Sequence, residues 1–173
     1  MRLLSVIRPV RRGLAALSLL LPLLSGCLYG FAGGGLPPHV RTVAVLPLDN
    51  ETSSPELPRE LQDALRQGLQ SRLGLRDAPE ERATAIVRGK ITRYDLDMAA
   101  GFSANPSQAT SARRRLRVHV DIEIVDQVTG KVLWTRTGMQ ADGEYADRGE
   151  AQGRKQAIDR IVNDVIEGAQ SQW

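Results

Sequence analysis

Hydrophobic and polar residues alternate most regularly along residues 115–124. Apolar side chains occupy every second position: Leu116, Val118, Val120, Ile122 and Ile124. Polar side chains stand between them: Arg115, Arg117, His119, Asp121 and Glu123. A period of two predicts a β-strand with one buried face and one solvated face.

Two other segments repeat their apolar residues with the period of an α-helix. The first stripe consists of Leu57, Leu61, Leu65, Leu69 and Leu73. Ser53 and Glu56 resemble a capping box in front of it, and Gly74 can end it. The second stripe consists of Ile158, Ile161, Val162, Val165 and Ala169, with Asp147 and Glu150 as its candidate capping pair. We therefore expect two helices, each with one apolar face.

Three more segments have the composition of strands. Residues 41–48 are apolar on both faces, which is typical of a strand covered on both sides. In residues 83–95, one face carries Ala85, Val87, Gly89 and Ile91, and the other carries Arg88, Lys90 and Thr92. Residues 131–137 follow a turn at 127–130, with Val132 and Trp134 on one face and Leu133 on the other. The polar stretch 98–112 is predicted to be a loop, longer than most connections.

The expected order of elements is therefore β-α-β-β-β-α. This order predicts an α+β fold, in which a four-stranded mixed sheet carries two amphipathic helices packed on one face. The other face of the sheet stays partly polar and basic. Residues 40–173 should form a single domain of this kind.

The N-terminal segment has the pattern of an export leader. Arg2, Arg8, Arg11 and Arg12 precede an apolar stretch at 13–24, which is too short to span a bilayer as a helix. The residues Leu24-Ser25-Gly26-Cys27 then read as a bacterial lipobox. We predict that residues 1–26 are a cleaved signal peptide and that Cys27 is lipidated.

Cys27 is the only cysteine, so lipidation leaves no thiol for a disulfide, a metal site or nucleophilic catalysis. Residues 27–39 contain several glycines and prolines and should form a short tether between the lipid and the domain. By the general sorting rule for lipoproteins, Leu28 rather than an aspartate after the cysteine predicts the outer membrane. The expected location is the periplasmic face of that membrane, held by the lipid anchor.

Removal of the leader changes the charge of the protein. The whole chain carries 23 Lys and Arg against 20 Asp and Glu, and four of these arginines lie in the leader. The mature chain then has 19 basic and 20 acidic residues, a net charge of −1. With few aromatic residues as well, nucleic acid is not an expected partner.

No residue constellation favours an enzyme. His39 and His119 lie in different predicted elements, and no phosphate-binding loop or nucleophile elbow is present. The pair Asp95 and Asp97 is more typical of a solvated strand end than of acid–base catalysis. We expect no catalytic residue, no metal and no cofactor.

The distinctive charge feature is a run of arginines before and within the alternating strand. Arg113, Arg115 and Arg117 should share the polar face, and Arg88 and Lys90 join them if the second and third strands are neighbours. Arginine suits bidentate contacts with phosphates, so these five residues are candidate contacts for an anionic glycolipid. The alternative is an ordinary solvated face, since Asp121 and Glu123 offset the charge further along.

Several motifs, taken in order, resemble the LptE family of lipopolysaccharide (LPS)-assembly lipoproteins. They are Cys27 to Phe31 with the Gly/Pro stretch, the segment 40–52, the strand 83–89 and the segment Asp126 to Trp134 with its Thr-Gly-Lys-Val-Leu-Trp. The chain departs from the family pattern at Leu28, where glycine is common, and at Thr84, which replaces the usual acid. No pattern of the family matches residues 98–112.

This resemblance implies a fold of two helices on a four-stranded sheet. It also implies an outer-membrane lipoprotein that plugs LptD, the LPS-inserting β-barrel, in a 1:1 complex. Such a protein assists the folding of the barrel and contacts LPS itself. In that role, Leu133 and Phe102 would be exposed apolar residues that the barrel covers. The alternative is a lipoprotein that activates a peptidoglycan synthase or helps to assemble a secretion channel, which the short tether disfavours.

Overall fold

The computed structural model describes residues 36–99, 113–146 and 149–171. Seven elements carry the fold in these ranges: β1 (Thr42–Val45), α2 (Leu57–Leu73), η2 (Glu80–Arg82), β4 (Ala85–Ala99), β5 (Arg113–Asp126), β6 (Val132–Ala146) and α3 (Glu150–Ser171). Two very short strands, β2 (Asp49–Asn50) and β3 (Arg76–Asp77), complete them. The leader, most of the tether with Cys27, and residues 100–112 with Phe102 lie outside the described residues.

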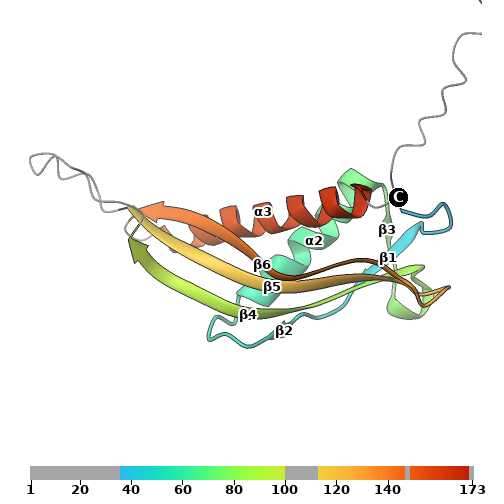
Figure 1. Cartoon of the computed structure of the whole chain (residues 1–173), viewed down its shortest axis with the longest axis horizontal. Coiled ribbons are helices and arrows are strands. Elements are labelled where there is room, and N and C mark those ends of the chain that lie inside the picture. Colours follow the sequence, from blue (N-terminus) through green and yellow to red (C-terminus); the bar gives the residue numbers. More distant parts are fainter. Residues whose placement is uncertain (1–35, 100–112, 147–148, 172–173) are drawn as a thin grey trace, which may run out of the picture. The chain divides into compact units, whose positions relative to one another are not determined.

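The strands form one mixed sheet in the order β3-β1-β4-β5-β6, and β2 also pairs with β4 (Figure 1). β1, β2 and β3 pair in parallel, whereas β4, β5 and β6 form a long antiparallel meander. The predicted α+β class is confirmed. The described part of the sheet differs from the prediction by the two-residue strands β2 and β3, which are too short to leave a hydrophobic pattern.

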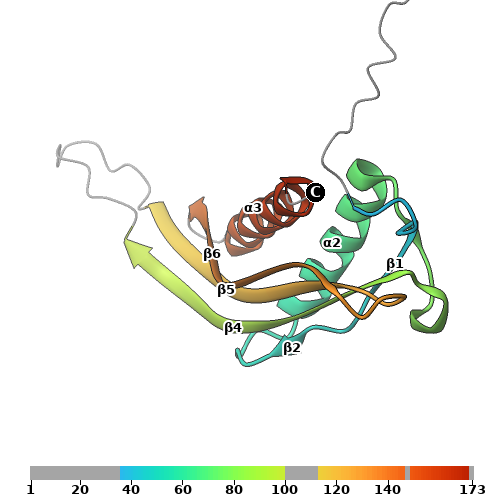
Figure 2. The same ribbon diagram turned by 45° about the vertical axis from the view of Figure 1, so that its right-hand side comes forward.

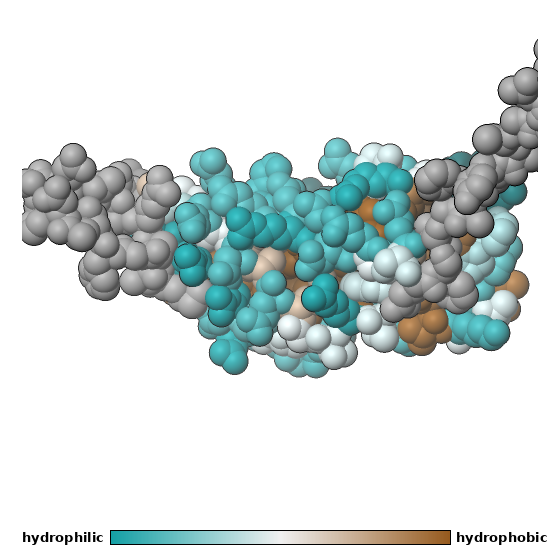
Figure 3. Space-filling model, turned by 45° about the horizontal axis from the view of Figure 1, so that its top comes forward, coloured by the Kyte–Doolittle hydropathy of each residue, from teal (hydrophilic) through white to brown (hydrophobic). Residues whose placement is uncertain are grey.

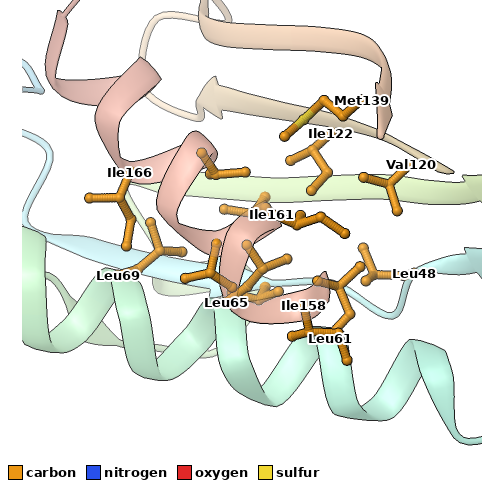
Figure 4. Packing of buried hydrophobic residues seen from close by; sticks show 14 of the residues in the cluster. Leu48, Leu61, Leu65, Leu69, Val120, Ile122, Met139, Ile158, Ile161 and Ile166 are labelled. Atoms are coloured by element: carbon orange, nitrogen blue, oxygen red, sulfur yellow. The ribbon is translucent and has the colours of Figure 1, made fainter. Parts of the chain in front are cut away.

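Both helices cover the same face of the sheet, as expected (Figure 2). The apolar residues of β5 are buried on this face, and the stripes of the two helices pack on them and on each other. Figure 4 shows Leu61 and Leu65 of α2 beside Ile158 and Ile161 of α3, and Leu69 beside Ile166. Full burial of one such side chain stabilises a fold by about 1.5–3 kcal/mol, so this layer is the main source of stability.

The ends of α2 confirm one sequence prediction and correct another. Gly74 ends the helix in the left-handed conformation, with φ at 67° and its N–H donating to Leu69. The Ser53–Glu56 capping box is wrong, because Glu56 itself is the N-cap residue and no side chain caps the helix. Asn50 instead closes the preceding loop by bonding to Thr52 and Ser54, while Pro58 supplies the first turn.

β6 is twice as long as the predicted strand at 131–137, because it continues to Ala146. A register shift between Ile124 and Val125 of β5 adds an extra residue opposite them, so the expected alternation fails there. Leu133 and Trp134 are consequently both buried, and Val132 is exposed. The expectation that Leu133 is an exposed residue for a partner to cover is therefore wrong.

The second half of β6 faces α3 through small residues. Ala141, Gly143 and Tyr145 are buried on that side, and Gly143 lies against the backbone of Gly153. Such close contact gives few apolar positions, which explains why the hydrophobic pattern did not reveal this strand. Within the described ranges, neither helix combines the length and apolarity needed to cross a bilayer.

Candidate functional site

The face of the sheet away from the helices is lined with charged residues from β4, β5 and β6. Arg115, Arg117 and His119 of β5 lie on it and are each partly exposed. The register places Asp95 of β4 on one side of Arg117 and Asp142 of β6 on the other. We call this surface the outer face, and it contains the arginines that the sequence singles out.

Arg117 is the most strongly held cation of the outer face. Its guanidinium makes two hydrogen bonds with Asp142, at 2.5 and 3.0 Å. These hydrogen bonds from Arg117 hold the pKa of Asp142 below its usual range. Arg115 adds longer contacts, at 3.5 Å with Glu144 and 3.8 Å with Asp142. The pair Arg117–Asp142 is thus a bidentate ion pair of the kind with the best-defined geometry.

His119 has a partner that sequence reasoning missed. Its Nε2 atom lies 3.1 Å from Asp95, which reaches it from the neighbouring strand. Sequence spacing showed only Arg117 and Asp121 as the flanking charges on the same strand. No signal in the sequence could have identified Asp95, because the register between β4 and β5 shifts next to Arg93.

Arg88 and Lys90 lie on the outer face as well, but nearer the β5–β6 turn. Arg88 forms an ion pair with Glu123 at 2.7 Å, and Lys90 forms one with Glu51 at 3.1 Å. The hydrogen bond to Glu51 raises the pKa of Lys90. Lys90 stands opposite Asp121, which is four positions along β5 from Arg117, roughly 13 Å at strand spacing.

The structure therefore brings the predicted cations onto one face but divides them into two groups. Arg88 and Lys90 form one group, and Arg115 and Arg117 form the other. Arg113 is the first residue of β5 and its backbone pairs with Ala146, whereas its side chain is not among those that the structure describes. Because carboxylates pair with the cations of both groups, the outer face is a mixed-charge surface rather than a purely cationic one.

A second cluster of charges ties the two helices to the sheet. Arg154 of α3 is nearly buried and binds both oxygens of Glu60 in α2, at 2.7 and 3.0 Å. Arg154 also contacts Glu150, which accepts a hydrogen bond from the hydroxyl of Tyr94. Burial and the hydrogen bond with Glu150 raise the pKa of Tyr94. This network fixes α2 and α3 relative to β4, so its role is structural.

Among the charged residues whose side chains the structure describes, Asp126 is the one that is fully buried, with 2% of its surface exposed. It accepts hydrogen bonds from the backbone N–H groups of Val128 and Thr129 and from the Thr129 hydroxyl. It also lies 2.7 Å from Nε2 of His39, which precedes β1. Asp126 thus organises the β5–β6 turn and fastens the N-terminal segment to it.

The histidines and carboxylates of the described ranges are the side chains there that could ligate a metal ion. No group of three His, Cys, Asp or Glu side chains there could hold a metal ion. Each histidine pairs with one aspartate, His39 with Asp126 and His119 with Asp95. An open groove of about 530 Å³ on the outer face is lined by Arg88, Lys90, Asp121, Glu123 and neighbours that include Thr135. Its lining therefore mixes positive and negative side chains.

The turn that Asp126 organises carries the motif Asp126, Thr129-Gly130-Lys131 and Leu133-Trp134. The model of the LptE family, described as lipopolysaccharide-assembly, matches residues 40–167 of the chain. The chain belongs to the LptE family. The match begins just before β1 and ends within α3, so it covers the whole described sheet.

The fold of this LptE protein also occurs in solved structures of low sequence identity. A singly substituted form of the PelC dodecamer from Paraburkholderia phytofirmans is 18% identical, with a TM-score of 0.51 over 80% of this chain and 94% of that chain. The protein XCC0632 from Xanthomonas campestris is 10% identical, with a TM-score of 0.51 over 75% and 86%. The hypothetical protein CT253 from Chlamydia trachomatis is 11% identical, with a TM-score of 0.50 over 76% and 96%. No curated protein matches the sequence.

In this LptE chain, the residues of the turn motif stabilise the β5–β6 turn and its packing against the domain. Gly130 has φ at 70°, a conformation that favours glycine. Asp126 and Thr129 bond within the turn, and Leu133 and Trp134 are buried under the helices. The motif therefore builds the turn and its packing.

Proposed function

We propose that this protein acts in LPS assembly as a lipid-anchored outer-membrane lipoprotein. In this proposal it plugs the LPS-inserting β-barrel LptD in a 1:1 complex, assists the assembly of that barrel and has no enzymatic activity. The observation that carries the proposal is the match to the LptE family over residues 40–167. Lipidation of Cys27 and a cleaved leader at 1–26 are part of the same proposal.

The mixed charge of the outer face supports a plug. The lumen of an outer-membrane β-barrel is polar, so a domain inside it needs a hydrated surface with paired charges. The outer face offers such pairs, for example Arg117–Asp142 and Arg88–Glu123. From the helix side, the described surface is also mainly hydrophilic (Figure 3). Among the residues whose side chains the structure describes, the large exposed hydrophobic ones are Leu96, Val128 and Val132.

The test is to purify the tagged, lipidated protein from detergent-solubilised outer membranes and to identify the co-purifying chain by mass spectrometry. We expect a stoichiometric β-barrel of the LPS-assembly type. Recovery of a peptidoglycan synthase or a secretion channel in its place would contradict the plug and support the alternative role. Recovery of this chain alone under the mildest detergent would also contradict it.

The lipid anchor has its own expected outcome. Cys27→Ala should leave the domain folded, because Cys27 lies outside the domain, but it should release the protein from the membrane fraction. Fractionation of cells that carry the variant measures this, with circular dichroism of the purified variant as the control for folding. Unchanged membrane attachment would show that the lipobox interpretation is wrong.

LPS contact through Arg113, Arg115 and Arg117 is a further part of the proposal. Replacing all three with glutamine should weaken LPS binding about tenfold at low salt, since three ionic contacts of about 0.5 kcal/mol each combine to that factor. The effect should shrink as salt rises. Glutamine is chosen because it places no new acid beside Asp142. The matched control replaces Arg59, Arg66 and Lys155 on the helices with glutamine. Equal affinity of the two variants would leave the outer face as a solvated surface.

A further inference from the structure

Three segments meet at the end of the sheet where the N-terminal chain enters the domain. His39 is bound to Asp126 at the base of the β5–β6 turn, at 2.7 Å. Gln127 of that turn donates to the carbonyl of Thr84, and Arg76 donates to the carbonyl of Arg41. Figures 1 and 2 both show the turn and the start of β1 at the same end of the sheet. The turn is therefore held next to the segment that leads back to Cys27.

This end also carries exposed apolar side chains. Val128 in the turn is 68% exposed and Val132 just after it is 48% exposed. The other large hydrophobic residue exposed in the described ranges is Leu96, which lies toward the opposite end of β4. The hydrogen bonds of Asp126 and the positive φ of Gly130 already fix the conformation of this turn, so the turn itself does not require valine at positions 128 and 132.

The cations at this end differ from those of the outer face. Arg41, Arg76, Arg82 and Lys131 are exposed, and the structure records no ion pair for their side chains among the described residues. The contact recorded for the Arg41 guanidinium is with the carbonyl of Pro38. Glu80 and Glu81 offset part of this charge, and Asp77 is neutralised by its ion pair with Arg66 of α2, which leaves an excess of two positive charges. Arg76 lies in β3 and Lys131 directly precedes β6, the two outer strands of the order, so four inter-strand steps separate them by roughly 19 Å.

We infer that this end of the domain is a membrane-contact surface that lies on the anionic phospholipid leaflet to which the chain is anchored. The surface, which we call the basal surface, consists of Arg41, Arg76, Arg82, Val128, Lys131 and Val132. The valines would enter the headgroup boundary, and the long basic side chains would reach the phosphates around them. The inference rests on the proposed lipid anchor at Cys27 and is independent of the barrel partner.

The length of the tether argues for this occupant. His39 is twelve positions after Cys27, a reach of at most about 40 Å when fully extended. Two valines and a small positive excess would bind a bilayer weakly from solution. The tether, however, makes the contact intramolecular and raises its effective concentration. The basal surface should therefore meet the bilayer in the lipidated protein and not in an unlipidated one.

The experiment places a fluorescent label at the turn of the lipidated full chain. In Val128→Cys the new thiol is the one available for labelling, because an acylated Cys27 takes up no label, and the unsubstituted chain is the blank. Leu96→Cys is the matched control, an exposed apolar residue at the far end of β4. The proteins are reconstituted in vesicles of phosphatidylethanolamine and phosphatidylglycerol that contain spin-labelled quencher lipids and no LPS.

We expect the label at residue 128 to lose most of its fluorescence to the quencher lipids and the label at residue 96 to lose little. Adding Arg76→Glu and Arg82→Glu should reduce quenching at residue 128, whereas Arg59→Glu with Arg136→Glu, the same charge change elsewhere, should not. Equal quenching at residues 128 and 96 in protein that floats with the vesicles overturns the basal surface and leaves the anchor intact. Protein that does not float with the vesicles overturns both.

Discussion

Replacing Gly143 with alanine is expected to destabilise the protein by about 3 kcal/mol, at the upper end of the range for overpacked cores. A methyl group at this position of β6 would lie 1.8 Å from the carbonyl oxygen of Gly153 and 2.5 Å from its carbonyl carbon. Both atoms belong to the backbone of α3 and cannot rotate away. The helix would have to move off the sheet, and the close packing of Gly153 over the buried side chains of Leu116 and Tyr145 would loosen.

Urea denaturation followed by circular dichroism measures this loss. Gly74→Ala is the matched control, because a methyl group there meets nothing within 4 Å and the expected loss is the conformational one alone, about 1 kcal/mol. If the two variants lose equal stability, the close approach of β6 and α3 relaxes without cost and the packing argument fails.

Replacing Asp126 with alanine is expected to lower the free energy of unfolding by about 3 kcal/mol. The change removes a charged acceptor that holds three donors of the β5–β6 turn. One hydrogen bond to a charged group contributes about 1.5–3 kcal/mol, and water reaches the exposed Val128 and Thr129, so the expected loss is near the upper end for a single bond. It also releases His39 from the turn. His39→Ala is the matched control. It should lower the free energy of unfolding less, because the turn keeps its own hydrogen bonds and the His39 side chain is 45% exposed.

The charge of Asp126 should also appear in the dependence of stability on pH. Burial acts to raise its pKa, but the hydrogen bonds from Thr129, His39 and the backbone N–H of Val128 outweigh burial and lower the pKa to about 2. A folded-state pKa below the unfolded value of 3.8 contributes stability above pH 4, and this contribution is lost as the pH falls from 4 toward 2. The contribution at neutral pH is about 2 kcal/mol.

Denaturation curves at several pH values between 2 and 7 test this prediction. The Asp126→Asn variant cannot titrate at this position, so its stability should fall less steeply between pH 4 and pH 2 than that of the unsubstituted protein. Parallel curves for the two proteins would show that Asp126 titrates alike in the folded and unfolded states.

The elements that sequence patterns predicted correctly are those with local causes. The alternation in β5 and the leucine and isoleucine stripes of α2 and α3 each arise from the repeat of one backbone conformation. Gly74 ends α2 for an equally local reason, its left-handed backbone. The capping box failed because the loop from Asn50 to Ser54 closes through bonds that the spacing of Ser53 and Glu56 does not reveal.

In the candidate site too, the features with local causes could be predicted from the sequence and those that depend on distant segments could not. The polar residues of β5 and the basic residues of β4 could be assigned to one face from alternation alone, and the structure places them there. Their partners could not be assigned, because Asp142 and Glu144 lie in the half of β6 that has no hydrophobic signal. The sequence therefore predicted a cationic patch, whereas the structure shows a mixed-charge surface, because these acidic partners pair with the arginines.

The sequence by itself determined the α+β class, the two amphipathic helices, the polar side of β5 and the resemblance to the LptE family that the family match confirms. These features depend on periodicity and composition, which are properties of neighbouring residues. Only the tertiary structure decided that Leu133 is buried, that Arg117 is paired with Asp142, and that His39 joins Asp126 beside the β5–β6 turn. The first depends on the bulge that shifts the register between β5 and β6. The other two join side chains that are 25 and 87 residues apart in the chain and that only the assembled sheet brings together.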